Sequence, residues 1–149
     1  RWSPSRRRSV TRPSRCSPPP AFDLGKLVTF EVSNGSSLVY GVDPASIRIS
    51  KADGIVRYVM VASSATGARN VMYEGIRCTT GEFKTYARYS SEGGWKPLAQ
   101  PEWRSLFADM PSRYALRFAQ AGGCDNAAMP PSVDVLVSRL KNPNFRIEK

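Results

Sequence analysis

"IVRYVMVASSATGARNVMYEGIRCTTGEFKTYARY", residues Ile55–Tyr89, is the stretch that decides the fold. Its first part, Ile55–Ala62, is apolar on both faces of an extended chain, which is typical of a strand covered on both sides. The turns "SSATG" and "TTG" divide the stretch into three segments of strand character. The last segment alternates, with Phe83, Thr85, Ala87 and Tyr89 on one face and Glu82, Lys84, Tyr86 and Arg88 on the other. Three such strands joined by short turns predict an antiparallel meander.

The flanking segments extend this sheet. Before it, short segments of strand character are Lys26–Val32, Ser37–Val42 and Ile47–Ser50, separated by turn sequences such as "SNGSS" and "DPAS". After it, "KPLAQPEW" is an edge strand or a loop, because its two prolines cannot donate hydrogen bonds to a neighbouring strand. We therefore expect a sheet of about five strands.

Two helices are predicted after the strands. Tyr114, Phe118 and Ala121 follow a helical spacing, and "GG" at 122–123 ends that helix. A second helix begins with Ser132 as its cap and ends before Pro143, with apolar residues at helical spacing: Val133, Leu136, Val137 and Leu140. Strands followed by helices predict an α+β fold with both C-terminal helices packed on the sheet.

Length and charge divide the chain in two. Its 149 residues fit one domain, with 41% hydrophobic and 23% charged residues. The net charge is +10, but residues 1–15 contain six arginines and no acid, which leaves 16 basic and 12 acidic residues, a net charge of +4, for the rest. We expect a disordered Arg/Ser/Pro-rich leader over residues 1–21 and a single domain over residues 22–149.

The leader has a functional alternative. Its arginines Arg6, Arg7, Arg8, Arg12 and Arg15 could form an arm that binds nucleic acid or another polyanion. Trp2 is the leader's one aromatic residue that could stack on a base, and for that reason a plain disordered leader is favoured. Binding that weakens with salt and is lost without residues 1–20 would identify the arm. No apolar segment reaches the roughly 20 residues that span a bilayer. No secretory signal peptide precedes the domain, so we expect an exported protein to be represented here in processed form.

The chain contains no histidine, which restricts the chemistry it can perform. Ser-His-Asp and Cys-His mechanisms are excluded, and the three dispersed cysteines do not form a zinc motif. We predict no catalytic residue, no metal site and no cofactor, and we infer no small-molecule substrate.

Cys78 and Cys124 could be a disulfide or, in the case of Cys78, a nucleophile. A nucleophile needs a cation or a base beside the sulfur, but Arg77 is adjacent in a strand and should point to the opposite face. A disulfide needs only proximity and an oxidising compartment, and would tie the sheet to the helices. The disulfide is favoured, which leaves Cys16 free or available for intermolecular pairing.

The stretch Gly41–Cys78, "GVDPASIRISKADGIVRYVMVASSATGARNVMYEGIRC", together with "EFKTYARY", a tryptophan, "PEW" and a late cysteine, resembles the cryptic neisserial protein family. The resemblance covers Phe22 to Cys124 and leaves out the leader and the segment after Cys124. It implies a secreted, periplasmic or lipoprotein-like protein of Gram-negative bacteria without an assigned activity, and it implies no catalytic residue. Cys16 lacks the small apolar residues that precede a lipidated cysteine, so we infer no lipid anchor from it.

Glu74 is an unexpected carboxylate in the middle of a strand. It could be a general acid or base, or one member of a cross-strand ion pair. With the hairpin centred near Ala65–Thr66, Arg57 lies opposite Glu74 and Lys84 lies on the next strand, which favours a structural ion pair of these three residues. A bulge at Gly75 would shift this register by one residue.

Trp95 and Trp103, next to Lys96 and Arg104, form a candidate surface for a protein partner. The alternative is that the tryptophans cover an open edge of the core. Together these observations predict a non-enzymatic periplasmic binding or structural domain, as an accessory subunit of an envelope or membrane protein complex. Binding of nucleic acid or another polyanion through the arm is the alternative.

Overall fold

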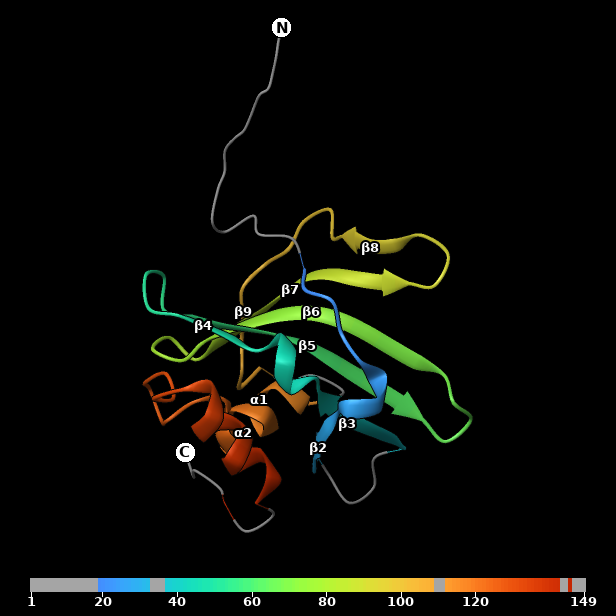
Figure 1. Cartoon of the computed structure of the whole chain (residues 1–149). Helices are drawn as coiled ribbons and strands as arrows, with labels where there is room; N and C mark the ends of the chain where they lie inside the picture. Colours follow the sequence, from blue (N-terminus) through green and yellow to red (C-terminus); the bar gives the residue numbers. More distant parts are fainter. Residues whose placement is uncertain (1–18, 33–36, 109–111, 143–144, 146–149) are drawn as a thin grey trace, which may run out of the picture.

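The computed structural model describes residues 19–32, 37–108, 112–142 and 145, and its centre is the predicted meander (Figure 1). Its long strands are β5 (Ile55–Ser64), β6 (Arg69–Arg77) and β7 (Glu82–Ser90), each antiparallel to the next. The antiparallel arrangement is confirmed. β5 is buried along most of its length, as its continuous apolar sequence predicts.

The sheet has eight strands rather than about five. The additional strands are short: β2 (Val28–Phe30), β3 (Leu38–Val42), β4 (Arg48–Ser50), β8 (Gly94–Pro97) and β9 (Arg104–Ser105). The order is β2-β3-β5-β6-β7-β8, with β4 also paired to β5 and β9 to β7. Among the short strands, β2, β3 and β4 fall within the predicted segments Lys26–Val32, Ser37–Val42 and Ile47–Ser50. β9 has two residues, too few for its periodicity to be read from sequence. The segment "KPLAQPEW" becomes the end of β8, a loop and the approach to β9.

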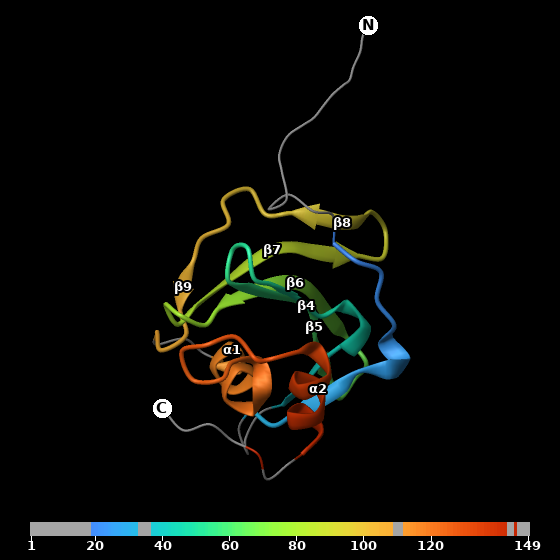
Figure 2. The same ribbon diagram turned by 60° about the vertical axis from the view of Figure 1, so that its left-hand side comes forward.

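The two predicted C-terminal helices are present and lie on one face of the sheet (Figures 1 and 2). The first, α1 (Tyr114–Phe118), continues into a π-helical turn, η4 (Ala119–Gly123). The second, α2 (Val133–Lys141), begins as predicted, with the Ser132 hydroxyl accepting a hydrogen bond from the Val135 N–H at 3.2 Å. In the part of the chain that the structure describes, no helix has the length and apolar character needed to cross a bilayer.

The main core lies between the sheet and the helices. The side chains that face the helices from the long strands pack against α1 and α2, and Phe118 of α1 contacts Tyr58 of β5 with ring centroids 4.5 Å apart. Fully buried members of this layer include Val56, Tyr58, Met60, Ile76, Phe118 and Leu136.

The opposite face of the sheet is covered by the segment that precedes β2. A second apolar cluster on this face contains Val59, Val61, Val71, Tyr73 and Ala87. Phe22, Leu24 and Leu27 pack on it, and the segment contains the 3₁₀ turn η2 (Leu24–Lys26). A second 3₁₀ turn, η3 (Pro44–Ser46), follows β3. The Asp43 carboxylate accepts a hydrogen bond from the Asp23 N–H at 2.8 Å and so fixes the path of this segment. Cover on both faces explains why β5 carries apolar residues on both of its faces.

Gly122 is expected to be intolerant of a side chain, because it closes η4 against α2. Its φ is 147°, and a Cβ would lie 2.9 Å from the Arg139 Cβ and 3.1 Å from the Leu136 carbonyl oxygen. We expect Gly122→Ala to lower the free energy of unfolding by about 2 kcal/mol or more in chemical denaturation. Gly67→Ala is the matched control, because Gly67 also has a positive φ (94°) but has open space around it. A loss for Gly122→Ala no larger than the loss for Gly67→Ala would contradict the packing argument.

Candidate functional site

Glu74 is fully buried and, with Asp43, is one of two buried carboxylates among the described residues. It lies opposite Tyr58 of β5 and Thr85 of β7, on the face of the sheet that carries the helices. Thr85 Oγ1 donates a hydrogen bond to Glu74 Oε2 at 2.9 Å. The hydroxyl of Tyr114, brought over the sheet by α1, donates to the same oxygen. The other oxygen, Glu74 Oε1, is buried without a hydrogen-bond partner among the described residues, as is the Tyr58 hydroxyl.

Burial makes Glu74 titrate in an unusual range. Loss of hydration raises its pKa from the ordinary value near 4.5 to about 7, although the hydrogen bonds from Tyr114 and Thr85 and the charge of Arg88 lower it. Burial and the neighbouring Glu74 raise the pKa of Tyr114, so the tyrosine stays protonated and remains a donor. Glu74 therefore changes its charge near neutral pH.

Thr85 and Tyr114 also line a cleft of about 450 Å³, which we call the Glu74 cleft. Arg88 of β7 and Arg104 of β9 line it as well. The remaining lining residues come from β7, from the loop after β8 and from the residues before α1: Phe83, Leu98, Gln100, Pro101, Glu102 and Ser112. Glu74 itself does not line the cleft but lies behind the two hydroxyls.

A β-bulge in β7 places Arg88 at the cleft. Tyr73 pairs with Ala87 but Glu74 pairs with Thr85, so Tyr86 has no partner in β6. The extra residue reverses the alternation, and Arg88 shares a face with Thr85. The predicted faces of the Glu82–Tyr89 segment are therefore wrong beyond the bulge.

The predicted ion pair of Arg57, Glu74 and Lys84 is also wrong. Ser63 pairs with Arg69, which places Gly75 opposite Arg57 and turns the arginine to the other face from Glu74. The Arg57 guanidinium instead forms an ion pair with Asp53, at 2.7 Å between Nη2 and Oδ2. Lys84 lies over the rings of Tyr86 and Trp103, with Nζ 5.6 and 5.2 Å from the centroids.

The predicted partner surface consists of Trp95, Lys96, Trp103 and Arg104, and in the structure these residues lie on two different faces of the sheet. Trp95 pairs with Tyr89 on the face away from the helices, where its ring contacts Phe22 and Tyr89 at centroid distances of 5.6 and 5.3 Å. Lys96 pairs with Arg88 on the helix-bearing face and is exposed.

Trp103 and Arg104 also lie on opposite faces of the sheet. The Trp103 ring lies 4.0 Å from the guanidinium carbon of Arg77 and covers it. Arg104 pairs with Phe83 and lines the Glu74 cleft. Sequence reasoning found Arg104 but missed Thr85, Arg88 and Tyr114, because only the bulge and the position of α1 bring them to Glu74.

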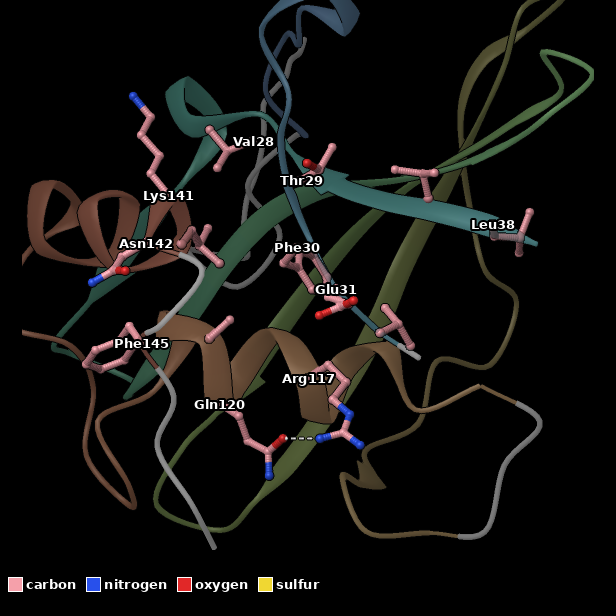
Figure 3. A pocket seen from close by; sticks show the side chains of 14 residues that line it. Val28, Thr29, Phe30, Glu31, Leu38, Arg117, Gln120, Lys141, Asn142 and Phe145 are labelled. Carbon is pink, nitrogen blue, oxygen red and sulfur yellow. Dashed lines mark hydrogen bonds between the residues drawn. The ribbon is translucent and has the colours of Figure 1, made fainter. Parts of the chain in front are cut away.

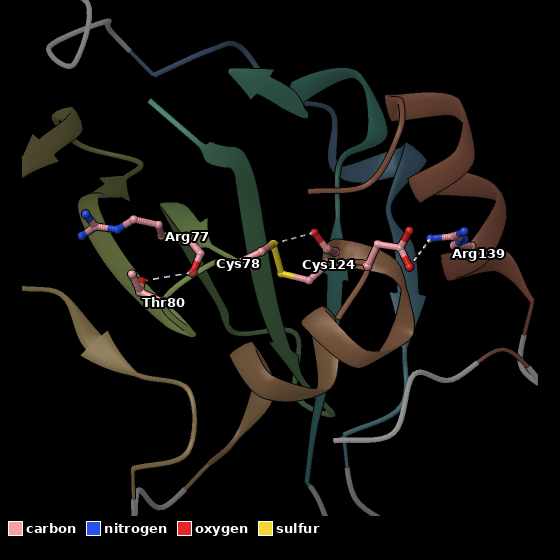
Figure 4. The surroundings of a disulfide bond; sticks show 7 residues. Arg77, Cys78, Thr80, Cys124 and Arg139 are labelled. Atoms are coloured by element: carbon pink, nitrogen blue, oxygen red, sulfur yellow. Dashed lines mark hydrogen bonds and ion pairs between the residues drawn. A yellow bond between two sulfur atoms is a disulfide. The ribbon is translucent and has the colours of Figure 1, made fainter. Parts of the chain in front are cut away.

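The predicted disulfide is confirmed: Cys78 and Cys124 are bonded at an S–S distance of 2.03 Å (Figure 4). It joins the end of β6 to the residue after η4, and the two cysteines are only 4% and 3% exposed. The carbonyl oxygen of Gly123 lies 3.6 Å from the Cys78 sulfur. Figure 4 shows Arg77 directed away from the bond, so this cation does not activate the sulfur. A pocket of about 190 Å³ borders the two cysteines, with Leu106, Phe107 and Leu116 in its lining.

A larger pocket, of about 630 Å³, lies between β2 and the end of α2 (Figure 3). Its charged side chains, Glu31, Arg117 and Lys141, are exposed or half-buried. Arg117 already donates to the Gln120 side-chain oxygen at 3.0 Å. This pocket lacks the buried titratable group that distinguishes the Glu74 cleft, so we place the candidate site at the cleft.

One further prediction receives no test from the geometry. The arginine arm, Arg6, Arg7, Arg8, Arg12 and Arg15, lies outside the described residues, and polyanion binding through it stays a prediction. Within the described part of the chain, no group of three His, Cys, Asp or Glu residues is placed to hold a metal ion.

Comparison with known proteins identifies the family of the chain. The model of the CNP1-like family matches residues 10–141, most of the chain. No curated protein and no solved structure matches the chain. Because the matched region contains the whole sheet, the disulfide, the Glu74 cleft and both helices, the chain belongs to the CNP1-like family.

Proposed function

We propose that the protein is a non-enzymatic binding domain of the periplasm, where it serves as an accessory subunit of an envelope or membrane protein complex. The observation that carries the proposal is the disulfide between Cys78 and Cys124, both buried. Disulfides persist in oxidising compartments outside the cytoplasm and are rare where glutathione and thioredoxin keep thiols reduced. The resemblance of the central stretch to secreted or periplasmic proteins of Gram-negative bacteria supports the same compartment.

Two features favour binding over catalysis. The Glu74 side chain is fully buried behind Thr85 and Tyr114, whereas a general acid or base must reach the proton that it transfers. Cys78 is held in a disulfide, so it offers no thiolate as nucleophile. The rigid cross-link between sheet and helices suits a domain that presents a fixed surface.

The edge formed by β8 and β9 is the surface that we propose for the protein partner. β8 is the last strand in the sheet order, and Lys96 and Arg104 on these strands are both exposed. Unpaired strand edges and exposed cations suit an acidic partner surface. Lys96→Glu should therefore abolish isolation of the complex from native membranes, with Lys51→Glu, exposed in the turn before β5, as the matched control. An intact complex with Lys96→Glu would contradict this surface.

The compartment is tested by trapping thiols before cell lysis. We expect Cys78 and Cys124 to resist alkylation in the protein made by its native host and to become reactive only after reduction, as read by mass mapping of the two peptides. The same chain retained in the cytoplasm is the control and should be alkylated at both positions. Free thiols at Cys78 and Cys124 in the native protein would reject the proposed compartment.

A further inference from the structure

We propose that the Glu74 cleft is a binding site for a small organic carboxylate, held by Arg88 and Arg104 over the hydroxyls of Thr85 and Tyr114. This proposal goes beyond the binding of a protein partner and does not depend on it. It follows from four features of the cleft: its cations, its hydroxyl floor, its apolar wall and the buried carboxyl behind it.

The two arginines are available to a ligand. Arg88 and Arg104 approach the cleft from two different strands, and both are exposed. The ion pairs among the described residues use other arginines, namely Arg57, Arg77 and Arg139. A guanidinium offers paired N–H donors that match the two oxygens of a carboxylate.

The floor of the cleft adds hydroxyl groups. Thr85 and Tyr114 line the cleft while they donate to Glu74 Oε2. Ser112 also lines the cleft, and its hydroxyl forms a hydrogen bond with the Tyr40 hydroxyl at 3.0 Å. When Glu74 is protonated it can donate to one of its two partners, and that hydroxyl can then donate its own hydrogen into the cleft.

The other walls select the kind of anion. Phe83, Leu98 and Pro101 provide apolar surface for the hydrocarbon part of a ligand, and the volume of about 450 Å³ is that of a small-molecule site. Glu102 lines the same cleft, and Glu74 lies behind its floor. These two carboxyl groups repel a doubly charged phosphate more strongly than a singly charged carboxylate.

Glu74 should couple this binding to proton uptake. The groups that face it are Tyr58 from β5, Thr85 and Arg88 from β7, and Tyr114 from α1. Burial raises the pKa of both tyrosines, so Glu74 is the member of this group that titrates near neutral pH. An anion bound over Thr85 and Tyr114 favours the neutral form of Glu74. We therefore expect affinity to be about fivefold higher at pH 6 than at pH 8, the change that one unit of pKa coupling produces around a pKa of about 7.

The test is an NMR titration of the full chain with butyrate, with the neutral isostere butyramide and inorganic phosphate as comparison probes. We expect butyrate to give saturable shifts at the amides of Thr85, Arg88, Arg104 and Tyr114, and butyramide to give none. Arg88→Gln combined with Arg104→Gln should weaken butyrate binding at least about tenfold. Arg69→Gln, at an exposed position of β6 outside the cleft, is the matched control and should not change it.

Glu74→Gln separates the ligand site from the proton coupling. This variant should bind butyrate at pH 8 as well as the wild type does at pH 6, because the buried negative charge is absent. Absence of saturable shifts with butyrate, equal binding of butyramide, or unchanged binding after loss of both arginines would overturn the carboxylate site. Stronger binding of phosphate than of butyrate would also overturn it, in favour of a phosphate site. None of these outcomes would alter the thiol-trapping result, so failure here is distinguishable from failure of the proposed function.

Discussion

Reduction of the Cys78–Cys124 disulfide is expected to lower the free energy of unfolding by about 4 kcal/mol, because the bond closes a loop with a sequence separation of 46 residues. Most of this loss comes from the unfolded chain, which gains conformations once the cross-link is removed. The folded state also loses its covalent connection between β6 and the turn after α1. A loss of this size is a large part of the stability of a domain of 149 residues. Urea unfolding of the oxidised and reduced wild type measures it directly.

Comparison of the two redox forms keeps the side chains the same and so isolates the cross-link. Cys78→Ala combined with Cys124→Ala should unfold at a denaturant concentration no higher than the reduced protein, since it also removes the two buried sulfur atoms. Cys16→Ala is the control for loss of a thiol outside the pair. Coincident unfolding curves for the oxidised and reduced wild type would show that the bond does not hold the helices to the sheet.

The stability of the wild type is expected to fall by about 3 kcal/mol as the pH rises from about 4.5 to about 7, through Glu74 alone. The pKa of Glu74 is near 4.5 in the unfolded chain and about 7 in the folded protein. The folded state therefore binds the proton more tightly, so this contribution is fully present below the unfolded pKa and is lost as the pH passes through the folded one. Above pH 7 the protein carries a buried, half-satisfied carboxylate.

Glu74→Gln should remove this slope and make the protein more stable than the wild type at pH 8. Glutamine has the same shape, stays neutral and can still accept from Thr85 and Tyr114. Other groups contribute equally to the pH profiles of the two proteins, so the difference between the profiles reports Glu74. Chemical denaturation at a series of pH values from 4 to 9 gives that difference.

Tyr114→Phe provides the second variant for this prediction. It removes a hydrogen bond that lowers the pKa of Glu74, so the loss of stability should shift to higher pH than in the wild type. Parallel profiles for the wild type and Glu74→Gln across this range would show that Glu74 does not change its charge on folding as proposed.

Much of the fold could be predicted from local sequence. The apolar run of β5, the turn residues of the meander and the Ser132 cap of α2 each depend on residues close together in the chain. The disulfide was predictable from the number and placement of the cysteines together with the lack of a base beside them. β9 was not, because it has two residues and no period to detect.

The error at Glu74 has a definite cause in the turn between β5 and β6. A two-residue centre at Ala65–Thr66 would place Arg57 opposite Glu74. In the structure the Ser64 N–H donates a hydrogen bond to the Ala68 carbonyl oxygen. The loop therefore has one residue more than the predicted two, and Gly67 occupies it at positive φ. A difference of one residue in register moves every side chain of a strand to the other face.

The sequence by itself determined the three strands of the meander, the two helices and the covalent link, because periodicity, turn residues and cysteine placement act over short distances or leave a direct mark in the chain. Only the tertiary structure decided the Glu74 cleft. The register that turns Glu74 toward the helices depends on the turn between β5 and β6. The bulge at Tyr86 brings Arg88 to the cleft, and a hydrogen bond between residues 40 positions apart joins Tyr114 to Glu74. Burial of the carboxyl, which raises its pKa, is a property of all these contacts together, and no local pattern of residues encodes it.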